Sequence, residues 1–149
     1  MIDIIVFIGC VLCGYCIGKY IEKCIAVKGL FYQDVRRYTV GLRENVTGRQ
    51  LELDKFNGEF AQNCSAAFAD YLTNGKCKCK LSKNQKKNLL DFFGNLDCVS
   101  SVQLSEHLDY YGKILEDDCR QVTEKEASRA GVYGKLGMLL GAMLGIMLM

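Results

Sequence analysis

The C-terminal segment constrains this chain more than any other part of it. From Leu136 to Met149 no side chain is charged or able to form a hydrogen bond, so contact with water offers it nothing. Counted from Ala130, the apolar segment is 20 residues long and is interrupted only by Lys135. A helix of that length spans about 30 Å, the thickness of a bilayer hydrocarbon core, and the Lys135 stem can carry its ammonium to the interface. We predict a transmembrane helix over residues 132–149; a buried core helix or a frayed apolar end is the alternative.

The N-terminal segment has the same character. Residues 4–18 are uncharged, and we predict a first transmembrane helix over residues 1–20. The competing interpretation is a cleaved or lipidated signal peptide, which requires a basic start and a small-residue cleavage site. Asp3 is the first charged residue and no Ala-x-Ala motif follows it, so the sequence favours a span.

Glycines recur at helical spacing in both apolar segments. In the C-terminal segment Gly137, Gly141 and Gly145 form one stripe, and Gly14 and Gly18 form a shorter one in the N-terminal segment. Helices lined by small residues can approach each other backbone to backbone in lipid. We predict that the two stripes pack, within one chain or between copies.

Basic residues indicate the orientation of the two spans. They follow the first span and precede or enter the second: Lys19, Lys23, Lys28, Arg36, Arg37, Lys125, Arg129 and Lys135. Because basic flanks stay on the cytoplasmic side, we predict a membrane hairpin with residues 21–131 in the cytoplasm and both termini outside.

The middle of the chain reads as helical throughout, which makes the predicted fold class all-α. The sequence contains no proline, and apolar residues recur every three to four positions. This spacing predicts helices over residues 20–46, 53–74, 82–96 and 100–122, with capping-box starts at Ser82 and Ser100. The third helix is expected to bury Leu89, Leu90, Phe93 and Leu96. We expect a small helical bundle.

A lysine-rich segment is the strongest charge feature. It contains six lysines and no acid: Lys76, Lys78, Lys80, Lys83, Lys86 and Lys87. One interpretation is an ordinary solvated loop, and the other is a docking surface for an acidic partner or anionic lipid. Arginine and base-stacking aromatic residues are missing from the run, which argues against nucleic acid.

Candidate chemistry is sparse. The spacing of Cys10, Cys13 and Cys16 resembles a metal or iron–sulfur motif. A cluster needs four ligands, however, and no fourth Cys or His neighbours these three in sequence. The Cys77-x-Cys79 pair lies among lysines, which can lower a thiol pKa, but it has no second pair to complete a zinc site. His107 has no nucleophile beside it. We therefore expect no catalytic residue, no metal and no cofactor.

The layout resembles the stage III sporulation protein AB family. The resemblance is carried by the two apolar ends, by Phe93-Gly94-Asn95-Leu96 with Gln103, and by the segment Tyr133–Gly141. It implies a cytoplasmic bundle similar to a domain of the type II secretion inner-membrane platform protein. It also implies a place in the complex between mother cell and forespore, where the family acts as a membrane platform with a cytoplasmic ATPase.

The leading hypothesis is therefore a non-enzymatic platform component in the mother-cell membrane, working with that ATPase and other membrane components. Further copies of the same chain are also candidate partners. Two alternatives stay open. One is a membrane protein that binds metal or reacts through Cys10, Cys13 and Cys16, and the other is a small membrane-bound regulator unrelated to sporulation.

Overall fold

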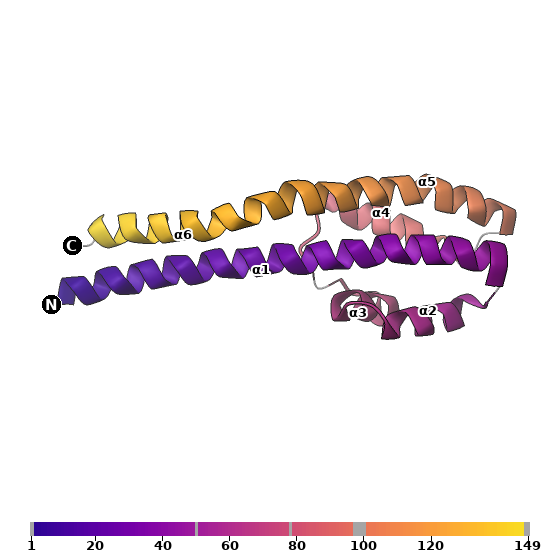
Figure 1. Ribbon diagram of the computed structural model, residues 1–149, viewed down its shortest axis with the longest axis horizontal. Coiled ribbons are helices and arrows are strands. Elements are labelled where there is room, and N and C mark those ends of the chain that lie inside the picture. The colour runs from indigo at the N-terminus through magenta and orange to yellow at the C-terminus, as the bar shows by residue number, and fades with distance from the viewer. Residues whose placement is uncertain (1, 50, 78, 97–100, 148–149) are drawn as a thin grey trace. The chain divides into compact units, whose positions relative to one another are not determined.

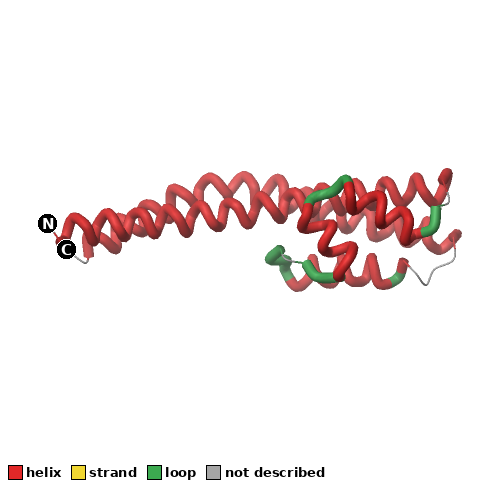
Figure 2. The backbone as a smooth tube through the Cα atoms, turned by 90° about the horizontal axis from the view of Figure 1, so that it is seen from below, coloured by secondary structure: helices red, strands yellow, loops and turns green. Residues whose placement is uncertain are grey.

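The computed structural model describes residues 2–49, 51–77, 79–96 and 101–147. Within these ranges the chain is helical with short loops and contains no strand, as Figure 1 and Figure 2 show. The elements are α1 (Ile2–Glu44), the π-helical turn η1 (Asn45–Arg49), α2 (Leu53–Gln62), α3 (Ala66–Asn74), α4 (Lys83–Gly94), α5 (Ser101–Arg120), the π-helical turn η3 (Gln121–Glu126) and α6 (Ala127–Met147). The all-α prediction is confirmed.

The chain divides into two compact units. The terminal unit comprises Met1–Ala26 and Thr123–Met149, and the central unit comprises Val27–Val122. Because α1 and the run from α5 to α6 each cross a boundary, each supplies helix to both units.

In the terminal unit, the N-terminal part of α1 and helix α6 lie side by side (Figure 1, Figure 2). Large apolar side chains cover its outer surface, for example Ile5, Leu139 and Met143, each at least 60% exposed. Helical stretches of the chain, Ile4–Gly48 and Gln103–Met147, each contain a window long and apolar enough to cross a membrane.

The central unit has an aromatic core. Phe31, Tyr38 and Phe68 are fully buried, and their rings contact one another or share Tyr71 and Phe93 as neighbours at centroid distances of 5.1–5.8 Å. Helices α2 and α3 pack against each other, as do α4 and α5. The rings come from α1, α3 and α4, so the core joins helices that are distant in sequence.

Local hydrogen bonds fix the ends of the helices. The Ser82 hydroxyl accepts from the Gln85 amide, and the Gln85 side chain accepts from the Ser82 amide, so the predicted capping box begins α4. Gly75 ends α3 in the left-handed conformation, at φ 64°. The Asn45 side chain donates to the carbonyl of Leu51 and accepts from its amide, both at 3.0 Å, which closes the turn from α1 to α2.

The predicted helix over residues 53–74 is wrong, because the structure contains two helices there. The Asn63 amide bonds the Phe60 carbonyl at 3.0 Å, and Ser65 is extended as the N-cap of α3. The buried Asp34 carboxylate accepts the Ser65 amide at 2.7 Å and holds the break in place.

The predicted buried face of α4 is also partly wrong. Leu89 and Leu96 are buried as expected, but Leu90 is 54% exposed, Phe93 is only half-buried, and Phe92 is fully buried. The predicted cap residue Ser100 lies outside the described residues, and α5 is described from Ser101.

Candidate functional site

The predicted glycines line the contact between α1 and α6 in the terminal unit. Gly14 and Gly137 face each other so closely that a Cβ on either would clash with the carbonyl oxygen of the other. A Cβ at Gly141 would lie 2.5 Å from the Cys10 carbonyl oxygen, and one at Gly18 would lie 2.7 Å from that of Tyr133. These distances are below any normal contact of a real Cβ, so glycine is required for the helices to lie this close.

The stripe extends beyond the backbone contacts. A Cβ at Gly145 would lie 2.6 Å from the ring of Phe7, so this glycine accommodates an aromatic side chain. Sequence reasoning missed Gly134, whose Cα would lie 2.8 Å from a Cβ at Gly18. Its position three residues before Gly137 is the signal that could have found it. A Cβ at Gly9 or Gly131 would meet nothing within 4 Å, so only some of the helical glycines are required for the close approach of the helices.

The lysine-rich segment lies in the central unit, in the loop after α3 and the first turns of α4. Lys76, Lys80, Lys83, Lys86 and Lys87 are all exposed, and Lys78 lies outside the described residues. The first turn of α4 carries no acid. Because a helix dipole disfavours cations at its N-terminus, typically by about 0.3–1 kcal/mol, the lysines do not stabilise α4.

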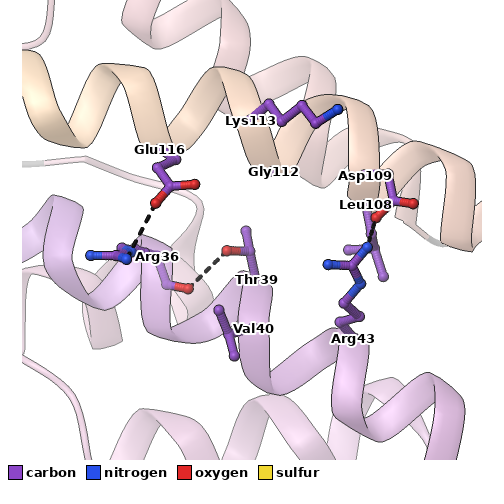
Figure 3. Close-up of a pocket in the computed structure, with 9 residues that line it drawn as sticks. All are labelled: Arg36, Thr39, Val40, Arg43, Leu108, Asp109, Gly112, Lys113 and Glu116. Carbon is purple, nitrogen blue, oxygen red and sulfur yellow. Dashed lines mark hydrogen bonds and ion pairs between the residues drawn. The ribbon is translucent and has the colours of Figure 1, made fainter.

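A groove runs between α1 and α5 in the central unit, with a volume of about 470 Å³ (Figure 3). Arg36 reaches across it to Glu116 at 3.2 Å, and Arg43 pairs with Asp109 further along. All four side chains are about half exposed or more, so each pair contributes little to stability. A partner could therefore bind these charged groups with little loss of stability from the broken ion pairs.

The remaining candidates for chemistry are dispersed. Cys10, Cys13 and Cys16 lie on α1 in the terminal unit, half-buried or exposed. His107 donates one hydrogen bond from Nε2 to the Phe92 carbonyl oxygen at 3.1 Å and stacks on the Phe92 ring, which gives it a packing role. Among the described residues, no three His, Cys, Asp or Glu side chains are grouped as metal ligands.

A family model for stage III sporulation protein AB matches residues 53–149, about two thirds of the chain. The chain belongs to the stage III sporulation protein AB family. The predicted resemblance is thereby confirmed. No curated protein and no solved structure matches the chain.

The stage III sporulation protein AB match covers α2 to α6. It includes Gly137, Gly141 and Gly145, the lysine-rich segment and the α5 side of the groove. Helix α1, with Gly14 and Gly18, precedes the matched residues, although the N-terminal end was among the features on which the resemblance was based. The family assignment therefore rests on the central helices and the C-terminal apolar segment.

Proposed function

We propose that this stage III sporulation protein is a non-enzymatic platform component, anchored in the mother-cell membrane as a hairpin. The observation that carries the proposal is the α1–α6 pair, in which glycines allow backbone contact while large apolar side chains cover the outside. In water such a surface would be costly to expose, whereas lipid accommodates it.

The hairpin holds the central unit on the cytoplasmic side. Basic side chains at both of its edges, including Lys23 and Arg129, support this orientation. Membrane vesicles washed with alkaline carbonate should retain the protein, and a tag inserted at Lys80 should be inaccessible from outside intact cells. Release by carbonate, or labelling of the tag from outside, would refute the anchored hairpin.

The partner that fits the family resemblance is a cytoplasmic ATPase of the same complex. The exposed lysines at the start of α4 support docking to an acidic surface. The first turn of α4 contains no acidic residue, and the lysines do not stabilise the helix. Co-isolation from native membranes should recover the ATPase together with other membrane components of the complex.

A charge-reversal experiment tests the docking surface itself. Replacing Lys80, Lys83 and Lys87 by Glu should weaken recovery of the ATPase by tenfold or more, since like charges would then face each other. The matched control replaces Lys55, Arg49 and Arg120 by Glu, which changes the net charge equally at positions outside the groove and outside the basic flanks of the spans. Equal loss in both variants, or no loss in either, would remove the lysine-rich segment from the interface. Binding of the protein to anionic vesicles without the ATPase would assign these lysines to lipid instead.

A further inference from the structure

A second feature of the central unit involves the two thiols of the loop after α3. Cys77 and Cys79 are half-buried and line a cavity of about 650 Å³ between the end of α3, the loop and α4. The apolar side chains Leu81, Leu89 and Leu90 contribute to its wall. The cavity is large enough for a small organic molecule, and it lies beside both sulfurs.

The cavity is cationic. Lys76, Lys80 and Lys86 line it, and no acidic side chain is among its lining residues in the part of the chain that the structure describes. A ligand that carries carboxylates would therefore be favoured over a neutral one.

The surroundings of the Cys77 thiol lower its pKa. The Cys77 thiol points to the Cys79 carbonyl oxygen, with 3.9 Å between sulfur and oxygen. A hydrogen bond from the Cys79 side chain lowers the pKa of Cys77 to about 7; a backbone hydrogen bond and the Lys86 charge act in the same direction, while burial opposes them. Burial instead raises the pKa of Cys64 and of Cys119. Burial and the nearby Cys77 thiolate together raise the pKa of Tyr71 to about 12. Of Cys64, Cys77 and Cys119, Cys77 therefore has the largest thiolate fraction near neutral pH.

We propose that Cys77 is a thiol-modification site for the disulfide of a small carboxylate-bearing thiol. The small thiol becomes bound to Cys77, and Cys79 then displaces it. This site is separate from the glycine-lined helices. It shares Lys76, Lys80 and Lys86 with the lysine-rich segment, but its chemistry does not depend on the platform function.

The reaction is a thiol–disulfide exchange in two steps. The Cys77 thiolate attacks one sulfur of the small disulfide, forming a mixed disulfide and releasing one small thiolate, which takes up a proton from water. The Cys79 thiol, after losing its proton, attacks the Cys77 sulfur and releases the second small thiol. The two cysteines end as one disulfide, and the small disulfide is reduced to two thiols, so the electrons balance.

Oxidised glutathione is the probe for the test, applied to the full chain in detergent at pH 7 and followed by peptide mass spectrometry. We expect Cys77 to react about fivefold faster than Cys64. Relative to an ordinary thiol, a pKa of about 7 raises the thiolate fraction at pH 7 about 50-fold, and the accompanying loss of nucleophilicity offsets about tenfold of that. Burial moves the pKa of Cys64 in the opposite direction, which adds to the difference.

The product identifies the role of Cys79. The unchanged protein should lose two hydrogen atoms and carry no glutathione, whereas Cys79→Ser should accumulate the mixed disulfide on Cys77. Equal modification of Cys64 and Cys77, or a mixed disulfide that persists in the unchanged protein, would overturn the proposal. Protection of both thiols by stoichiometric zinc or copper would also overturn it, in favour of a metal site.

The preference for an anionic ligand is tested separately with two alkylating reagents. The ratio of Cys77 alkylation by iodoacetate to that by iodoacetamide should fall about threefold in Lys86→Gln, the effect of one charge about 6 Å away in water. Taking the ratio cancels any change in the Cys77 pKa, since both reagents require the thiolate. Lys87→Gln is the matched control, because Lys87 does not line the cavity. An unchanged ratio in Lys86→Gln would refute the anionic preference.

Discussion

The two units of this protein hold their helices together in different ways. In the terminal unit the helices meet backbone to backbone, because Gly14, Gly137 and Gly141 have no side chain to hold them apart. In the central unit it is made by the largest side chains, with Phe31, Tyr38 and Phe68 fully buried.

The difference is the one expected if lipid surrounds the terminal unit, as proposed above, and water surrounds the central unit. In water, burying aromatic rings stabilises a fold by removing apolar area from the solvent. For a helix pair in lipid that gain is lost, because lipid tails are as apolar as the side chains, and close packing takes its place. The apolar outer surface of the terminal unit fits this second case.

The largest expected effect is on the aromatic core. Phe68→Ala removes a ring that contacts Phe31, Tyr38 and Phe60 at 5.5–5.8 Å and leaves a cavity, so it should lower the free energy of unfolding by about 3–5 kcal/mol. Denaturant unfolding in detergent, followed by the near-UV signal of the tyrosines, measures it. Leu90→Ala, at an exposed position of α4, is the control and should cost less than about 1 kcal/mol. Equal losses would mean that the rings do not form the core.

The next effect concerns the backbone contact. Gly141→Ala places a methyl group 2.5 Å from the Cys10 carbonyl oxygen and forces the helices apart, at a cost of about 1–3 kcal/mol. Hydrogen exchange of the α6 amides in detergent should speed up accordingly. Gly9→Ala is matched in chemistry but meets nothing within 4 Å, so it should leave exchange unchanged. If both variants behave alike, close approach is not what pairs these helices.

An effect of similar size is expected at the polar bond that separates α2 from α3. Asp34→Ala leaves the Ser65 amide without its carboxylate acceptor, which should cost about 1.5–3 kcal/mol in the same unfolding measurement. Asp34→Asn keeps an oxygen in place and should recover at least half of that. A loss as large in Asn as in Ala would show that the charge matters more than the hydrogen bond.

The smallest effect is expected in the groove. A double-mutant cycle on Arg36→Gln and Glu116→Gln should give a coupling of about 0–1 kcal/mol, because both side chains are 61% exposed. A coupling above about 2 kcal/mol would mean that the pair is shielded from water, and the central unit would then depend on more than its aromatic core.

Much of the fold follows from local signals. The apolar spacing predicted α1 and α5, and Ser82 with Gln85 predicted where α4 begins. The break at Ser65 could not be read from the sequence, since Phe60, Cys64 and Phe68 keep the four-residue spacing of one helix across it. The break depends on Asp34, 31 residues earlier in the chain.

The same limit applies to the sites. Leu89 and Leu90 are identical in kind, so only the phase of α4 against its neighbours decides which one is buried. The glycine stripes were visible because four-residue spacing is itself a helical signal. The sequence also showed Cys77 and Cys79 among lysines, but not the cavity that Leu81 and Leu89 form beside them.

The Asn45 side chain has a practical consequence for work on this protein. Its amide pairs with both backbone groups of Leu51 and so joins the two ends of the connection between α1 and α2. Since lengthening a closed loop costs little, about 0.6 kcal/mol per doubling, the exposed position Gly48 is a suitable insertion point for a fluorescent reporter.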